Sequence, residues 1–202
     1  WGNATPEHIE LCVVQLPGRE ERLGEPLMTN MAALVDALTH EIVASTDRPF
    51  ALLGHSMGAI IAYEVTCQLR AKGAIQPQHL FVSARAAPHL EGKGEPLRSL
   101  ENDQFIERLH QAYGAVPEAI RNSAELQKVF LPILRADVEL LETHIDTAAD
   151  PLECPISALG GTSDPAISAT MLAAWQERTS ANFVQHEFPG DHFYIYAERD
   201  AV

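Results

Sequence analysis

The chain has 202 residues, 46% of them hydrophobic, and a formal net charge of −14 at pH 7. This length fits one domain with a sizeable core, and no apolar run approaches the roughly 20 residues that a membrane-spanning helix needs. The strong negative charge argues against nucleic acid or an anionic membrane surface as the main partner.

The first predicted element is a strand. The apolar run IELCVVQL (9–16) is nearly continuous, as in a buried parallel strand, and ends at a Pro-Gly pair. A helix is expected to begin near Thr29 or Asn30, either of which can cap it, and to end before Asp47. The remaining strands and helices are expected at residues 50–54 (strand), 59–73 (helix), 79–84 (strand), 156–161 (strand), after Ser168 (helix) and 182–188 (strand).

Residues 89–150 interrupt this alternation. They contain no good strand pattern but two helical ones, DQFIERLHQAY and AELQKVFLPILRADVELLETHI. Strands alternating with helices predict a mostly parallel sheet with helices on both faces. We therefore expect a single α/β domain over residues 1–202, with a helical insertion (residues 89–150) placed over one end of the sheet.

One short pattern carries the strongest chemical signal. The segment PFALLGHSMGAIIAYEV (49–65) places GHSMG (54–58) between an expected strand and an expected helix. Gly-x-Ser-x-Gly alone is weak evidence, but this context is what a nucleophile elbow requires. Its two glycines let two backbones pass closely while the serine takes a strained conformation. We therefore predict that Ser56 is a nucleophile, with the backbone N–H of Met57 as the first oxyanion-hole donor.

A serine nucleophile needs a base to take its proton, and that base needs an acid to orient it. His192 follows the last predicted strand, at the carboxyl edge where α/β enzymes build their sites. Asp164 follows the strand at 156–161 and completes the order Ser, Asp, His expected for this fold. We predict these two residues as base and acid. Less suitable candidates are His55, His144 and His186 for the base, and Asp137 and Asp191 for the acid.

With these residues assembled, the chain resembles the stand-alone type II thioesterases of polyketide and nonribosomal peptide assembly lines. The resemblance runs from about residue 9 to the end. It rests on the segments VVQLPGREERLGEP, RPFALLGHSMGA, LFVSARAAPHL, LPILRADVELLE, CPISALGGTSDP and FPGDHFYI. Several such motifs together are more specific than the elbow alone.

The resemblance implies an α/β-hydrolase fold with Ser56, Asp164 and His192 as the triad and the helical insertion as a mobile lid over the acyl pocket. It implies hydrolysis of acyl thioesters from the phosphopantetheine arm of carrier proteins, without a cofactor or metal. It also implies a glycine-rich loop before Trp1 that supplies the second oxyanion donor. We therefore expect the natural polypeptide to be longer at both ends.

Several points stay open from the sequence. The same triad serves carboxylesterases and acyltransferases, and a catalytically inactive partner of a synthase is a further alternative that the intact triad disfavours. Three cysteines in or beside apolar runs are expected to be buried free thiols in a reducing cytoplasm; they are Cys12, Cys67 and Cys154. Apolar residues of the insertion either line an acyl path or pack its helices together; they are Phe130, Leu131, Leu134 and Leu141.

Overall fold

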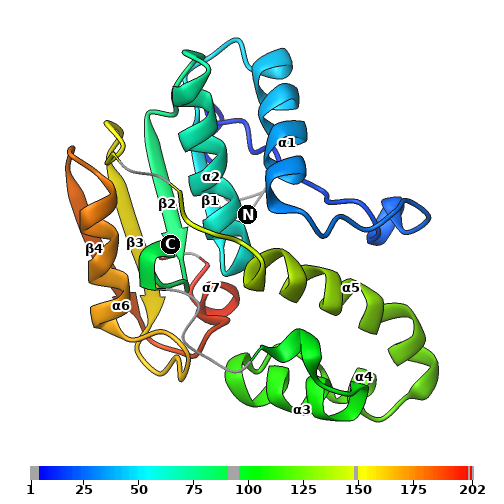
Figure 1. Cartoon of the computed structure of the whole chain (residues 1–202). Helices are drawn as coiled ribbons and strands as arrows, with labels where there is room; N and C mark the ends of the chain where they lie inside the picture. Colours follow the sequence, from blue (N-terminus) through cyan, green and yellow to red (C-terminus); the bar gives the residue numbers. More distant parts are fainter. Residues whose placement is uncertain (1–4, 91–95, 148–149, 200, 202) are drawn as a thin grey trace.

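The centre of the molecule is a four-stranded parallel sheet (Figure 1). The structure, a computed structural model, describes residues 5–90, 96–147, 150–199 and 201. The strands are adjacent in chain order and are β1 (Ala51–His55), β2 (His79–Ser83), β3 (Ile156–Gly161) and β4 (Phe183–Phe188). Their parallel pairing confirms the predicted α/β fold.

Three helices cover one face of this sheet: α1 (Met31–Ser45), α2 (Met57–Ala71) and α6 (Ala169–Ala173). The 3-10 helix η4 (Ala174–Arg178) continues directly from α6. Buried side chains of these helices form the main core with alternate residues of the strands. The residues that the sheet contributes are Leu80, Val82, Ile156 and Ala158.

The opposite face meets the short helix α7 (Tyr194–Ala197) at the carboxyl end of the sheet. Tyr194 and Ile195 form a separate cluster there with Leu159 of β3, and Phe81 of β2 packs against it. Both strand residues alternate with those of the main core, as the two-residue period of a strand requires. Helices therefore contact both faces, and α7 brings the end of the chain under the strand ends.

The expected helix caps Asn30 and Ser168 are confirmed, whereas α2 begins and ends two residues earlier than the expected helix at 59–73. Asn30 begins α1 by accepting a hydrogen bond from the backbone of Ala33 at 2.9 Å, and Ser168 accepts one from Met171 at the start of α6. Gly73 follows α2 with a φ of +61°, a conformation that glycine adopts without a Cβ clash. Local capping chemistry therefore defines these ends.

The helical insertion forms a layer beyond the carboxyl ends of the strands (Figure 1). Its longer elements are α3 (Asn102–Tyr113) and α5 (Ala124–Glu142), with the shorter η3 (Leu97–Ser99) and α4 (Glu118–Arg121) beside them. They share a small apolar core of their own. Its buried members are Phe105, Ile106, Leu109, Val116 and Val138.

The side chain of Arg135 links the helices of the insertion to one another. The guanidinium of Arg135 in α5 donates to the carbonyl of Leu100 at 2.7 Å and to the side chain of Asn102 at 2.8 Å. It also lies 4.5 Å from the ring centre of Phe105, within cation–π range. Its donors and its flat face are thus both used, which holds α5 to the start of α3.

A loop that precedes α1 reaches the insertion through an ion pair. Residues 17–28, here called the arm, include η1 (Glu20–Arg22). Two nitrogens of Arg19 lie 2.7 and 3.0 Å from the two carboxylate oxygens of Asp137 in α5. Because both side chains are about three-quarters buried, the two-point contact is screened less than a surface pair.

The expected strand at residues 9–16 is wrong. The segment has no regular secondary structure, and its apolar side chains are largely exposed, with Val13 at 81%. An apolar run becomes a strand only where a neighbouring strand pairs with its backbone, and in the described part of the chain β1 pairs with β2 alone. For the same reason Cys12 is exposed rather than buried, whereas Cys154 is buried and Cys67 half-buried.

Among the described residues, no helix is both long enough and apolar enough to cross a membrane.

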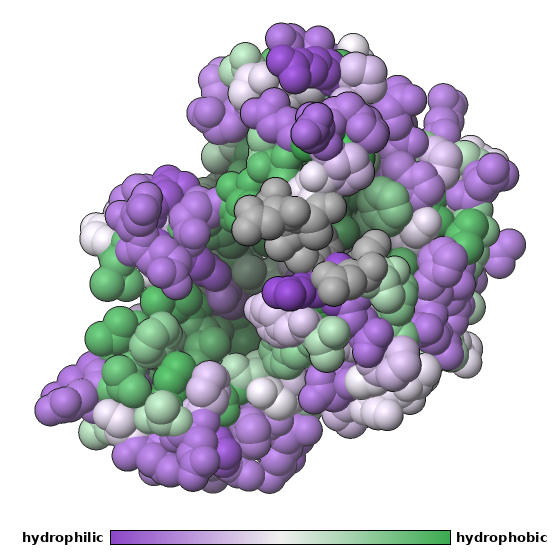
Figure 2. Space-filling view, turned by 180° about the vertical axis from the view of Figure 1, so that it is seen from behind, coloured by the Kyte–Doolittle hydropathy of each residue, from purple (hydrophilic) through white to green (hydrophobic). Residues whose placement is uncertain are grey.

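The surface seen from behind carries both hydrophobic and hydrophilic residues, as Figure 2 shows. Hydrophobic residues gather around a central hollow, whereas hydrophilic residues occupy most of the rim.

Candidate active site

The turn between β1 and α2 holds Ser56 in a strained conformation. Its φ of +53° and ψ of −117° lie outside the regions that a residue with a Cβ normally occupies. Such a residue costs about 1–3 kcal/mol and persists only where its surroundings enforce it. Here the backbone N–H of Ser56 donates to the carbonyl of Ser83 at 2.8 Å. That bond extends the pairing of β1 and β2 up to Ser56, the predicted nucleophile.

The two glycines that flank this serine have different roles. A Cβ on Gly54 would lie 2.0 Å from the carbonyl oxygen of Gly58, inside the first turn of α2. A Cβ on Gly58 would meet no atom within 4 Å. The close passage of β1 and α2 therefore requires Gly54 alone, which corrects the expectation that both glycines serve it.

Three side chains from three strand ends meet at this turn. His192 Nε2 lies 3.0 Å from Ser56 Oγ, and His192 Nδ1 lies 2.8 Å from Asp164 Oδ2. With Nδ1–H donating to the carboxylate, Nε2 is free to accept the serine proton. The Asp164 side chain is fully buried and that of His192 is 2% exposed. The structure thus brings together the three residues predicted from the sequence.

Asp164 lies in an environment that favours its charged form. Burial opposes ionisation, but the hydrogen bond from His192 and those from the backbone N–H groups of Ala166 and Ile167 outweigh it. The net effect lowers the pKa of Asp164 below its ordinary value. Its second oxygen, held by the two backbone donors, keeps the first one directed at the histidine.

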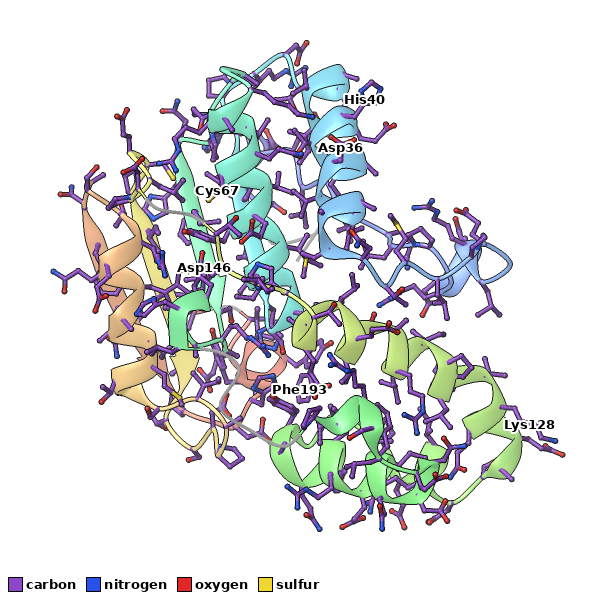
Figure 3. All side chains as sticks on the ribbon, viewed as in Figure 1. Asp36, His40, Cys67, Lys128, Asp146 and Phe193 are labelled. Carbon is purple, nitrogen blue, oxygen red and sulfur yellow. The ribbon has the colours of Figure 1, made fainter. Side chains whose placement is uncertain are left out.

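The loop after β4 holds the histidine in place. The backbone N–H of Ser163 donates to the carbonyl of Gly190 at 2.8 Å, and a Cβ on Gly161 would lie 2.2 Å from the carbonyl oxygen of Asp191. β3 and this loop therefore touch backbone to backbone. Phe193, which follows His192, lies between the sheet and the helical insertion (Figure 3).

The start of α2 carries Met57, the residue predicted as the oxyanion donor. Met57 is the first residue of that helix, so its N–H has no partner within the helix and lies at the positive end of the helix dipole. This is the arrangement that stabilises a developing oxyanion beside Ser56. The second donor, expected before Trp1, lies outside the described residues.

The other candidate histidines have different partners. His55 Nδ1 lies 2.9 Å from Ser83 Oγ, and its ring centre lies 5.4 Å from that of His192. His144 is paired with Glu64 of α2 at 2.8 Å. His186 lies exposed on β4.

The other candidate acids are also engaged elsewhere. Asp137 pairs with Arg19 of the arm, as described above. Asp191 Oδ1 accepts a hydrogen bond from the backbone of Phe193 at 2.8 Å and so shapes the turn that carries the histidine.

Two features of the site escaped the sequence analysis. Tyr113, the last residue of α3, places its ring centre 5.0 Å from that of His192. Ser83 and Tyr194 form a hydrogen bond of 2.7 Å beneath the histidine turn. No motif marks these residues, because their roles depend on how the insertion and α7 fold back over the strand ends.

No group of three or more His, Cys, Asp or Glu side chains within the described ranges is arranged to hold a metal ion. A strained serine at a strand–helix turn, hydrogen-bonded in series to a histidine and a buried aspartate, is the arrangement of an α/β serine hydrolase. The chain belongs to the thioesterase domain family, whose profile matches residues 1–202.

Individual relatives agree with this assignment. The gramicidin S biosynthesis protein GrsT of Aneurinibacillus migulanus is 39% identical over 199 residues, which cover 98% of this chain and 77% of GrsT. RedJ, a thioesterase from the prodiginine pathway of Streptomyces coelicolor, superposes with a TM-score of 0.83 at 37% identity, over 93% of this chain and 70% of RedJ. YbtT, a type II thioesterase from the yersiniabactin NRPS/PKS pathway, superposes with a TM-score of 0.83 at 31% identity, over 93% of this chain and 76% of YbtT. The predicted relationship to type II thioesterases is confirmed.

The asymmetry of the two elbow glycines leads to a stability prediction. We expect Gly54→Ala to lower the free energy of unfolding by at least about 3 kcal/mol, because the new methyl group meets backbone atoms that cannot move aside. Gly58→Ala is the matched control and should be neutral or stabilising by up to about 1 kcal/mol, because alanine favours the helix. Urea unfolding followed by circular dichroism measures both. Equal losses in the two variants would contradict the assigned roles.

The hydrogen bonds of the acid lead to a second prediction. Asp164→Asn should lower kcat by about 10³–10⁴-fold, because an amide no longer holds His192 in the required tautomer. Asp191→Asn keeps an oxygen that can accept from Phe193 and should stay within a few-fold of wild type. Steady-state hydrolysis of an acyl thioester measures both variants. A larger loss in Asp191→Asn would transfer the acid role to that residue.

Proposed function

We propose that this protein hydrolyses acyl thioesters from the phosphopantetheine arm of carrier proteins, and so clears and regenerates a polyketide or nonribosomal peptide synthase. The observation that carries the proposal is the series of hydrogen bonds from Ser56 to His192 to Asp164 at a strained strand–helix turn. The relatives add the substrate class, because RedJ and YbtT are both named as thioesterases of biosynthetic pathways.

In the first half of the reaction, Ser56 Oγ attacks the thioester carbonyl carbon and His192 Nε2 accepts the serine proton. Asp164 stabilises the imidazolium that forms. The backbone N–H of Met57 donates to the oxyanion of the tetrahedral intermediate. The carbon–sulfur bond then breaks, and the phosphopantetheine sulfur leaves with the proton from His192.

In the second half, water enters the position that the thiol has left. His192 accepts a proton from this water as its oxygen attacks the acyl-serine carbonyl. The ester bond to Ser56 breaks, and the serine oxygen recovers the proton from the histidine. The products are a carboxylic acid, a free carrier thiol and the unchanged enzyme.

The helical insertion acts in this proposal as a lid over the acyl group. Tyr113 lies against the ring of His192 and is therefore the lid residue that a bound acyl chain meets beside the catalytic atoms. Leu131 and Leu134 pack into the insertion's own apolar core, and Leu141 packs against the main core. Phe130 remains 39% exposed. These contacts favour helix packing as the role of the three leucines.

As part of the same proposal we assign the reaction to the cytoplasm. All three cysteines are free thiols, as a reducing compartment maintains them. The carrier, rather than a nucleic acid or a membrane, is the proposed partner, and no cofactor is required by the mechanism.

The proposed reaction is tested by intact-mass spectrometry. Wild-type protein mixed with an acyl carrier should remove the acyl mass from the carrier and show a matching transient adduct on itself. Ser56→Ala should leave the acyl carrier intact, because it removes the hydroxyl that accepts the acyl group in the proposed mechanism.

A matched oxygen ester of the same acyl group serves as the comparison substrate. Cleavage of the ester without cleavage of the acyl carrier would overturn the carrier assignment and identify an esterase. Continued hydrolysis by Ser56→Ala would instead overturn the triad assignment.

The contact between the lid and the histidine leads to a prediction about chain selectivity. Tyr113→Ala should raise kcat/KM for bulky acyl groups relative to acetyl by about 10-fold, because it opens space beside His192. Tyr113→Phe keeps the ring and should preserve the wild-type ratio. This ratio of kcat/KM values is measured by competition between two carriers that bear acyl groups of different length. An unchanged ratio in Tyr113→Ala would remove Tyr113 from the acyl path.

A further inference from the structure

A series of hydrogen bonds links three polar side chains next to the catalytic residues. Ser83 Oγ is 2.9 Å from His55 Nδ1 and 2.7 Å from the hydroxyl oxygen of Tyr194. Ser83 has no exposed surface and Tyr194 is 1% exposed. None of these three side chains takes part in the proposed proton transfers. Burying polar side chains costs folding free energy unless they are hydrogen-bonded to one another, so a buried series of this kind calls for an explanation.

Ser83 contacts the nucleophile turn at two points. It ends β2 and pairs in register with His55 at the end of β1. Its carbonyl accepts the backbone N–H of Ser56, and its hydroxyl meets the side chain of the preceding residue. Ser83 of the neighbouring strand thus contacts both residues joined by the peptide bond that precedes the strained φ angle, His55 and Ser56.

Tyr194 connects the same serine to the histidine turn. It stands two residues after His192, and its backbone N–H donates to the carbonyl of Asp191. Its ring stacks on Phe188 at the end of β4, with 5.3 Å between centres and an angle of 6° between the planes. Because the Tyr194 ring is rigid and packed against Phe188, the hydrogen bond of its hydroxyl with Ser83 restricts the position of the whole histidine turn.

We propose that Ser83 is a positioning residue that, through the Tyr194 hydroxyl, sets the distance between Ser56 and His192. The histidine turn is held by backbone contacts with the end of β3 and the loop after it, and by the hydrogen bond between Ser83 of β2 and Tyr194. The two catalytic turns therefore share a common support. This inference rests on the proposed role of Ser56 and His192 but on no particular acyl substrate.

The charge state of His55 is consistent with this role. Burial, followed by repulsion from His192, lowers the pKa of His55 to about 4, so it is neutral at pH 7. A second cation 5.4 Å from His192 would oppose the imidazolium that forms during catalysis. A neutral His55 can hold Ser83 without that penalty.

The test measures the reactivity of Ser56 separately from the choice of substrate. A fluorophosphonate labels a serine that its histidine activates, so the second-order labelling rate reports the Ser56–His192 geometry. Tyr194→Phe removes only the hydroxyl and keeps the ring stack, and it should slow labelling by about 3–10-fold, as expected for one lost hydrogen bond. It should lower kcat for acyl-carrier hydrolysis by a similar factor and leave KM unchanged.

Tyr63→Phe is the matched control. Tyr63 is another fully buried tyrosine, but it packs against Trp175 in the main core. Its variant should label at the wild-type rate. Ser83→Ala should slow labelling at least as much as Tyr194→Phe, because it also removes the contact with His55. The double variant should be no slower than Ser83→Ala alone, because the link that Tyr194→Phe breaks is already broken in Ser83→Ala.

Three results would overturn the inference: wild-type labelling by Tyr194→Phe, an equal effect of Tyr63→Phe, or multiplied losses in the double variant. If Ser83→Ala does not fold, the comparison of the two Tyr→Phe variants at a temperature well below their melting points still decides the question. Wild-type protein that is labelled but leaves an acyl carrier intact would contradict the proposed function without affecting this test.

Discussion

The strained peptide at Ser56 is the constraint on which the rest of the structure depends. A φ of +53° in a residue with a Cβ persists only if the neighbouring elements leave no relaxed alternative. Gly54 allows α2 to pack on β1 with no room for a side chain, and Ser83 binds the serine backbone from β2. The turn places Ser56 between the end of β1 and the first residue of α2. The proposed nucleophile and the proposed oxyanion donor, Met57, are therefore neighbours in one local conformation.

The remaining parts of the site come from other strand ends, so the sheet sets their spacing. Because all four strands are parallel, the loops after β1, β3 and β4 emerge at one edge. Backbone contacts at Gly161 bring the histidine turn against the acid-bearing loop without intervening side chains. Close backbone packing thus accompanies the distances of 2.8 and 3.0 Å between the three side chains.

Local patterns predicted much of this from the sequence. Strand–turn–helix context predicted Ser56, and position after a strand predicted Asp164 and His192. The structure brings these three side chains together, because parallel topology brings such positions to one edge. The run at 9–16 shows the limit of the method: its composition suits a buried strand, but pairing depends on a neighbour that the run itself does not specify. Tyr113 and Ser83 were missed for a related reason, since their contacts are made with segments distant in the sequence.

The contacts of the helical insertion are consistent with its proposed role as a lid that responds to substrate without disturbing the triad. Its helices are held to one another by a core of their own and by Arg135. Its polar links to the rest of the chain include the pair between Arg19 and Asp137 and the pair between His144 and Glu64. The three residues of the triad, by contrast, lie on segments that directly follow strands β1, β3 and β4. In the proposed role of the insertion as a lid, displacement of the Tyr113 ring would alter the space beside His192. The hydrogen bonds of His192 to Asp164 and Ser56 involve no residue of the insertion and can remain in place.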